Sequence, residues 1–161
     1  MPMESFFPYR LAVVAEAFSR QLVAVYGRQH GFSREEWRLL FLLEDAGALD
    51  SLQLARRTSL DKVQVSRAAA RLERKGLITR DVLEADRRLR NYRITNDGRA
   101  AFSRAFGAVE ARARRILDAM PPDDLAALKQ GIAALDRAIV GATGKDEATG
   151  FPRLPDPDAP R

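Results

Sequence analysis

The sequence predicts a mainly α-helical fold with one small β-hairpin, and three observations support this prediction. A short helix with clear start and stop signals spans residues 61–76. Directly after it, residues 77–95 contain two β-type runs joined by a polar, arginine-rich loop. Before and after this region, apolar residues recur at intervals of three or four, as in amphipathic helices. The short helix and the hairpin therefore form the centre of the chain, with longer helices on both sides.

The helix at 61–76 has a signal at each end. Asp61 is a favourable N-cap, and Gln64 completes a capping box with it. Gly76 suits the position just after a helix, where a residue without a Cβ turns most easily. At about 100° per residue, one face of the helix is apolar. It consists of Val65, Ala68, Ala69 and Leu72.

The other side of this helix is polar and leaves two interpretations open. A charged helix face is most often simply solvated. The residue types also suit the DNA major groove, where Arg pairs with guanine, Gln pairs with adenine, and Ser or Lys holds phosphate. The candidate DNA contacts are Lys62, Gln64, Ser66, Arg67 and Arg71. Arg74 lies near the helix end, where phosphate contact and solvent exposure are equally expected.

Composition excludes several classes of protein. The 161 residues suffice for one domain with a core, and no apolar run approaches the roughly 18 residues of a membrane span. The first ten residues lack the features of a secretory signal. There is no cysteine, which excludes disulfides and thiolate metal sites, and the single histidine, His30, cannot build a multi-histidine zinc site. We therefore expect no metal, no cofactor and no membrane association, and a cytoplasmic location.

The charge of the chain is unevenly distributed. The net charge is +5, but residues 56–93 hold 12 basic and 5 acidic residues, which is +7, so that the rest of the chain sums to −2. Such a concentration of positive charge is typical of a nucleic-acid-binding region. The acidic pairs Glu35-Glu36 and Asp123-Asp124 stand at predicted helix starts, where capping explains them. Because no phosphate-binding loop or G-x-S-x-G motif occurs, an enzyme is not expected.

The segments before the central helix predict two longer helices, a short strand and a short helix. An apolar stripe runs from Phe7 to Val25, and the first helix ends near 27–31. Ser33 and Glu36 form a capping box for the second helix, with Phe32 and Trp37 in the positions of a hydrophobic staple. Residues 48–49 suit a short strand, and a third capping box at 50–53 opens a short helix. This short helix, a turn at 58–60 and the central helix form a helix-turn-helix motif.

The segments after the central helix predict a hairpin and two more helices. Strands at 77–83 and 91–95 flank the loop at 84–90, whose arginines can enter a minor groove. These loop residues are Arg87, Arg88 and Arg90. A helix that starts at Asn96 or Asp97 ends at Pro121-Pro122. The last helix carries apolar residues spaced 3, 4, 3, 4, which is a seam for a partner helix and favours a symmetric dimer. The tail at 144–161, with four prolines, is expected to be disordered.

In the order and spacing of these elements, residues 5–143 resemble MarR-type winged helix-turn-helix regulators. The resemblance rests on three segments: the block DKVQVSRAAARLERKGLI, the D-x-R element Asp86-Arg87-Arg88, and Tyr92-Arg93-Ile94-Thr95 followed by Asn96-Asp97-Gly98. The last matches the family's L-T-x-x-G ending, with Ile94 where Leu is usual. The implied organisation is an N-terminal dimerisation helix (5–31), a winged helix-turn-helix domain (33–95) and C-terminal dimerisation helices (96–143). The recognition helix is then 61–76 and the wing is 77–95.

The resemblance implies a homodimer that binds a pseudo-palindromic operator in double-stranded DNA. Each recognition helix would enter a major groove, and each wing would insert Arg88 into the minor groove, oriented by Asp86. The implied role is transcriptional regulation, usually repression, relieved by a small phenolic or otherwise aromatic effector or its coenzyme A thioester. Candidates for an effector pocket are Tyr9, Arg10, Gln21 and Trp37.

Each effector candidate also has an ordinary structural explanation. Trp37 suits a core position, and the other three residues commonly flank a dimer seam. The alternative function is a DNA-binding or protein-interaction module without any small-molecule effector.

Overall fold

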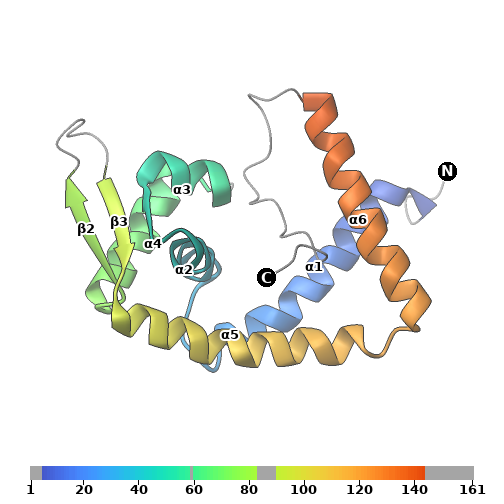
Figure 1. Ribbon diagram of the computed structural model, residues 1–161, viewed down its shortest axis with the longest axis horizontal. Coiled ribbons are helices and arrows are strands. Elements are labelled where there is room, and N and C mark those ends of the chain that lie inside the picture. The colour runs from blue at the N-terminus through green and yellow to red at the C-terminus, as the bar shows by residue number, and fades with distance from the viewer. Residues whose placement is uncertain (1–4, 59, 83–89, 144–161) are drawn as a thin grey trace.

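The computed structural model describes residues 5–58, 60–82 and 90–143 of the chain. Within these residues it is mainly helical, with one small antiparallel sheet, which confirms the predicted fold class (Figure 1). In chain order the elements are α1 (Phe7–Tyr26), α2 (Arg34–Ala46), β1 (Ala48–Asp50), α3 (Ser51–Thr58), α4 (Lys62–Arg74), β2 (Ile78–Val82), β3 (Arg90–Ile94), α5 (Asn96–Leu117) and α6 (Pro122–Thr143).

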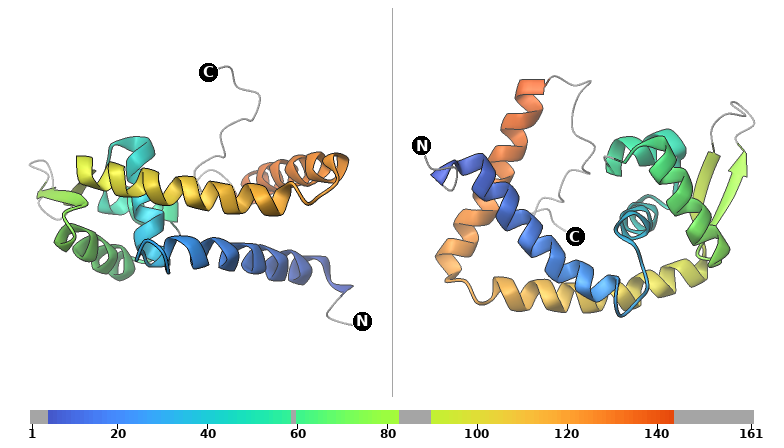
Figure 2. Two further views of the ribbon diagram at one scale, coloured as in Figure 1. Left: turned by 90° about the horizontal axis from the view of Figure 1, so that it is seen from below. Right: turned by 180° about the vertical axis from the view of Figure 1, so that it is seen from behind.

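The helices separate into a compact winged region and an extended helical region. Helices α2, α3 and α4 gather with the sheet at one end of the molecule, and α5 leads away from them (Figure 1). Helix α1 runs alongside α5, and the two remain side by side when the molecule is seen from below (Figure 2). Helix α6 turns back from the far end of α5. The long helices thus carry the chain from the winged region to a separate helical end.

Capping residues start the helices where the sequence predicts. The Ser33 hydroxyl accepts from the Glu36 N–H at 3.2 Å, and the Glu36 carboxylate accepts from the Ser33 N–H at 2.9 Å. The corresponding pair at α4 joins Asp61 and Gln64, at 2.7 and 3.0 Å. At α3, the Asp50 carboxylate accepts from the Gln53 N–H at 2.8 Å. Each box satisfies backbone N–H groups that a helix start leaves without partners.

The core lies where α2, α3, α4 and the sheet meet. The leucines of α2 dominate it, together with Leu54 of α3 and Leu72 of α4, which are fully buried. Val65 is 1% exposed and lies on the face that α4 buries. Trp37 packs against this core from its edge. Its ring stacks on Tyr26 of α1 at 4.9 Å and on Phe102 of α5 at 5.1 Å between centroids, so it ties three helices together.

The sheet has the strand order β1-β3-β2. Strands β2 and β3 pair antiparallel with Ile78 opposite Ile94, and β1 joins the other edge of β3 with Leu49 opposite Tyr92. Tyr92 and Ile94 are both buried, as the alternating pattern predicts. The hairpin tip, with the predicted contacts Asp86, Arg87 and Arg88, lies outside the described residues.

One short segment joins the hairpin, the end of α4 and the start of α5. Thr95 caps α5, because its hydroxyl accepts from the Gly98 N–H at 3.0 Å and donates to the Gly76 carbonyl at 2.8 Å. Gly98 is buried directly against the backbone of Leu77, and a Cβ at this position would collide with the Leu77 carbonyl oxygen. Only glycine therefore lets α5 begin this close to the hairpin.

The helical end of the molecule leaves large apolar side chains exposed. In α1, Phe7 and Val14 are 68% and 65% exposed. The predicted seam of α6 is also uncovered within one chain, with Leu128, Ile132, Leu135 and Ile139 all exposed. None of the helices described here has both the length and the apolar character of a membrane-spanning segment.

Candidate nucleic-acid interface

The recognition-helix candidate, α4, presents a polar face to solvent. Four apolar residues are buried on its opposite side, with Val65, Ala68, Ala69 and Leu72 at 1% exposure or less. Four of the predicted DNA contacts on this helix are exposed: Lys62, Gln64, Ser66 and Arg67. Within the described residues, Arg67 makes no hydrogen bond or ion pair. This helix face therefore has side chains available for a partner.

The first turn of α4 also contains a residue that the sequence analysis overlooked. Val63 is 56% exposed, between Lys62 and Gln64. Helical periodicity predicts its exposure, since at about 100° per residue Val63 lies about 160° from Val65 and about 180° from Leu72. An exposed apolar side chain in a row of polar ones is suited to the methyl group of thymine.

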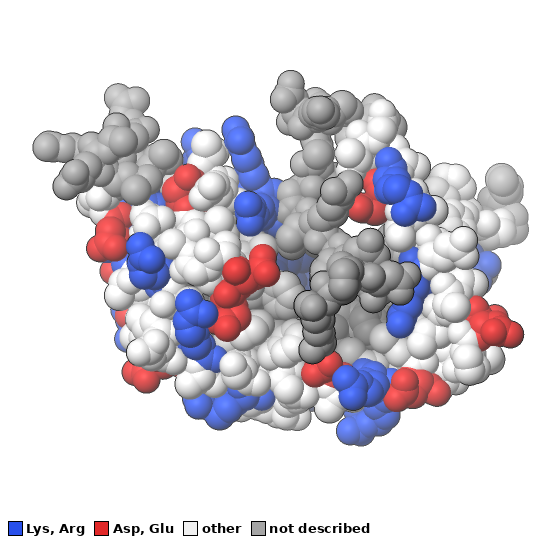
Figure 3. All heavy atoms as spheres, viewed as in Figure 1, with Lys and Arg blue, Asp and Glu red and all other residues white. Residues whose placement is uncertain are grey.

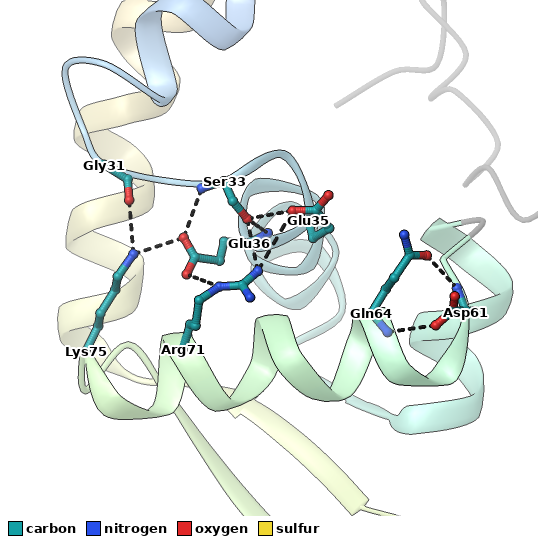
Figure 4. Close-up of polar contacts among 8 residues, drawn as sticks. All are labelled: Gly31, Ser33, Glu35, Glu36, Asp61, Gln64, Arg71 and Lys75. Atoms are coloured by element: carbon teal, nitrogen blue, oxygen red, sulfur yellow. Dashed lines mark hydrogen bonds and ion pairs between the residues drawn. The ribbon is translucent and has the colours of Figure 1, made fainter.

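Arg71 is the one described α4 candidate that turns away from the outer face. Its Nε donates to Glu36 Oε1 at 3.1 Å, and its Nη2 donates to the Ser33 hydroxyl at 3.3 Å (Figure 4). Glu35 lies 3.9 Å from the same guanidinium. The structure thus gives Arg71 partners on α2, and DNA contact by this residue remains a prediction.

Lys75 adds a second cation to this cluster. Its Nζ donates to Glu36 Oε2 at 2.9 Å and to the Gly31 carbonyl at 3.0 Å (Figure 4). Together with Arg71 it joins the end of α4 to the start of α2 and to the turn before it. We call Glu36, Arg71 and Lys75 the Glu36 cluster. It fixes the position of α4 relative to α2 through two charge-assisted contacts.

The carboxylate at the centre of the Glu36 cluster is fully enclosed. Glu36 is 1% exposed, and burial alone raises the pKa of such a group. The Ser33 N–H, Lys75 and Arg71 oppose this effect, and the net result is a pKa below the usual range for a glutamate. Glu36 is therefore ionised at neutral pH and pairs with both cations.

The wing supplies further basic side chains along its described strands. Arg93 is exposed on β3, and Arg80 on β2 lies 3.6 Å from Glu73 of α4. The sequence analysis did not select either residue, although the alternation with buried Tyr92 predicts that Arg93 points outward. Arg90, which it did select, begins β3 and is partly buried.

Basic and acidic side chains are interspersed on the face seen in Figure 3. Some of the described basic and acidic residues pair at the surface, as Arg99 does with Glu44 at 3.1 Å. The basic side chains seen on this face do not form one uninterrupted patch.

The four effector candidates do not come together within one chain. Tyr9 and Arg10 lie exposed in the first turns of α1. Trp37 instead packs on Tyr26, which is in the last turn of α1. At 1.5 Å rise per residue, these two ends of the helix are roughly 25 Å apart. Gln21 accepts a hydrogen bond from Arg112 of α5 at 2.8 Å. Within the described residues, no cluster of three or more His, Asp or Glu is placed to hold a metal ion.

A three-helix core, a β-hairpin and an exposed helix after a tight turn define a winged helix-turn-helix protein. Residues 30–89 match the model of the MarR family. The homoprotocatechuate degradative operon repressor of Escherichia coli is 27% identical over 89 residues, which span 55% of this chain and 60% of that repressor.

Solved structures support the same fold. NadR in complex with 4-hydroxyphenylacetate is 25% identical, with a TM-score of 0.66 over 84% of this chain and 97% of its own. A MarR-family regulator from Silicibacter pomeroyi is 22% identical, with a TM-score of 0.71 over 89% of this chain and 94% of its own. These likenesses cover the long helices as well as the winged region.

Proposed function

We propose that this protein is a homodimeric, sequence-specific DNA-binding transcriptional regulator. One observation carries the proposal: α4 exposes Lys62, Val63, Gln64, Ser66 and Arg67 while the Glu36 cluster fixes the helix to α2. A rigid helix with such a face can read base edges in a major groove. The wing would then reach the adjoining minor groove, with Arg88 inserted and Asp86 beside it.

The exposed apolar faces of α1 and α6 support the dimer. Large apolar surfaces on a water-soluble chain commonly mark an interaction site. A second copy of the chain would cover both faces by a two-fold axis. The DNA site would then be pseudo-palindromic, with half-sites about one helical turn, roughly 10 bp, apart.

We further propose repression that a small aromatic or phenolic molecule relieves. The E. coli relative is a repressor of a degradative operon, and NadR binds 4-hydroxyphenylacetate. The second candidate is a regulator without an effector, which the separation of Tyr9 from Trp37 within one chain favours. For repression that an effector relieves, a coupling free energy of about 1–3 kcal/mol between ligand binding and DNA binding would suffice.

Selection from a random duplex DNA library tests the DNA-binding proposal without knowledge of the target operon. Purified protein should enrich one inverted repeat with half-sites about one turn apart. Failure to enrich any sequence would contradict sequence-specific binding, and enrichment of a single unrepeated site would contradict the dimer.

The enriched site also separates the two regulatory mechanisms. A panel of aromatic acids, phenols and their coenzyme A thioesters is added to the protein-DNA complex. Release by one compound at saturating concentration supports an effector. DNA affinity that stays unchanged across the panel favours the effector-free regulator.

A further inference from the structure

Val63 is an exposed apolar side chain on the recognition-helix candidate. It is 56% exposed in the first turn of α4, about 160° around the helix from buried Val65. More than half of this residue's surface is thus left uncovered by the fold. A single exposed valine is ordinary on a protein surface, so its surroundings decide what it can do. Here those surroundings are the polar side chains that α4 presents to solvent.

Gln64, the next residue, is already engaged in the cap of α4. Its Oε1 accepts from the Asp61 N–H at 3.0 Å, and the Asp61 carboxylate accepts from the Gln64 N–H at 2.7 Å. Figure 4 shows the Gln64 side chain folded back toward Asp61. A glutamine that reads adenine must present its amide oxygen and its amide nitrogen to the base together. Gln64 would have to leave the capping box to do this, so it is better placed to hold the first turn of α4.

Arg67 lies one turn further along the same side of α4 as Val63. Residues four positions apart are neighbours on a helix surface, and here they are about 6 Å apart along the axis. Arg67 is exposed, and among the described residues it makes no hydrogen bond or ion pair. Val63 and Arg67 thus place a small apolar surface beside a guanidinium group that is available for a partner.

The major groove of DNA offers a matching pair of groups. Thymine presents its 5-methyl group there, and guanine presents two acceptors, O6 and N7, which a guanidinium can bind bidentately. Base pairs stack about 3.4 Å apart. Contacts that are about 6 Å apart on the helix therefore fall on base pairs about one or two steps apart.

We propose that Val63 recognises the 5-methyl group of a thymine in each half-site, about one or two base pairs from a guanine that Arg67 binds. Gln64 holds the first turn of α4 and contributes no base contact. The inference rests on the proposed function and deepens it, because it names the bases that the selected site must contain and the side chains that recognise them.

Replacement of thymine by deoxyuridine tests this contact, because it removes the methyl group and keeps the base pairing. Each thymine of the selected DNA site is replaced in turn, in both half-sites, and fluorescence anisotropy measures the affinity of the full chain. At one position we expect binding to weaken by about fourfold per half-site, which is the effect of losing one buried methyl group. In Val63→Ala, the thymine and deoxyuridine versions of that position should bind with equal affinity. The base preference that Arg67→Ala relaxes should be for a guanine within about two base pairs of this thymine.

Val82→Ala is the matched control. Val82 is 54% exposed on β2, so the substitution removes the same groups from a residue of similar exposure outside α4. Whatever its affinity for DNA, this variant should keep the full difference between thymine and deoxyuridine. Val63→Ala should itself fold, since Val63 is exposed and alanine favours a helix. Circular dichroism checks its helix content.

Three results would overturn the inference. The first is a selected site that has no invariant thymine, or in which deoxyuridine replaces every thymine without loss of affinity. The second is a difference between thymine and deoxyuridine that persists undiminished in Val63→Ala. The third is a preference relaxed by Arg67→Ala that lies further away or is not for guanine. In all three cases the protein still selects a site, so the proposed DNA binding stands while the inference fails, whereas failure to select any site would overturn both.

Discussion

Glu36 shows how one residue can cap one helix and position another. Its carboxylate closes the capping box of α2 through the Ser33 N–H and at the same time pairs with Arg71 and Lys75. The Glu36 side chain is 1% exposed, so the loss of its charge would leave the N–H donors of Ser33, Arg71 and Lys75 without their strong acceptor. The position of α4 relative to α2 thus depends on a single ionised side chain.

Replacement of this carboxylate should cost stability. In Glu36→Gln we expect the free energy of unfolding to fall by about 1–3 kcal/mol, because the charge-assisted contacts are lost while the shape is kept. Chemical denaturation measures this change. The control is Glu44→Gln, which breaks the partly exposed pair with Arg99 and should cost about 1 kcal/mol or less. Equal losses in the two variants would contradict a special role of Glu36.

The stability that Glu36 provides should depend on pH in a defined direction. The folded state lowers the pKa of Glu36, so its contribution is complete above the unfolded value, about 4.3, and is lost as pH falls through the lower folded value. The difference in unfolding free energy between the unsubstituted protein and Glu36→Gln should therefore be constant near neutrality and shrink in acid below about pH 4. A difference that grows as the pH falls would mean that the folded state raises the pKa.

Arg67 is the side chain most directly available for base recognition. Arg67→Ala should weaken binding to the selected DNA site by about 1–3 kcal/mol and relax the preference at one base pair of each half-site. Fluorescence anisotropy with single-base variants of the site measures both effects. Arg104→Ala, on α5, removes an exposed arginine away from α4 and should leave affinity and preference unchanged. Uniform weakening across all DNA variants would assign Arg67 to phosphate contact.

At the scale of elements, the start of α5 depends on one glycine. Gly98→Ala should destabilise the protein, because the new Cβ meets the Leu77 carbonyl oxygen and forces α5 away from the hairpin. We expect a loss of about 1–3 kcal/mol in thermal or chemical unfolding, as for other overpacked sites. Gly107→Ala on the same helix is the control, since its Cβ meets no neighbour and alanine favours a helix. Similar stability of both variants would contradict this close approach.

The elements were largely predictable from the sequence because their signals are local. The capping boxes at Ser33, Asp50 and Asp61 each lie within four residues, and all three form. The contact of Arg71 with Glu36 joins residues 35 positions apart, and helical periodicity alone could not reveal it. Periodicity places Arg71 about 100° from Leu72, at the side of the buried face. Only the structure shows that this side faces α2. The hydrogen bond between Arg112 and Gln21 was missed for the same reason, since it depends on how α1 packs against α5.

At the scale of the whole molecule, the apolar seam of α6 should hold the dimer. Ile132→Glu places a charge in the centre of this seam, and we expect a shift toward monomer with the helix content retained. Light scattering after size-exclusion chromatography measures the mass, and circular dichroism measures the helix content. Gln130→Glu introduces the same charge about 200° around the helix and should remain dimeric. A dimer that survives Ile132→Glu would place the interface elsewhere.

The most direct test of the account is the salt dependence of DNA binding by the unsubstituted protein. The selected site and a shuffled duplex of the same composition are titrated by fluorescence anisotropy at several salt concentrations. If α4 and the wing contact the site as proposed, the selected site should bind about a thousandfold or more tighter than the shuffled duplex at physiological salt, with affinity falling steeply as salt rises. Equal affinity for both duplexes at every salt concentration would contradict sequence recognition by α4.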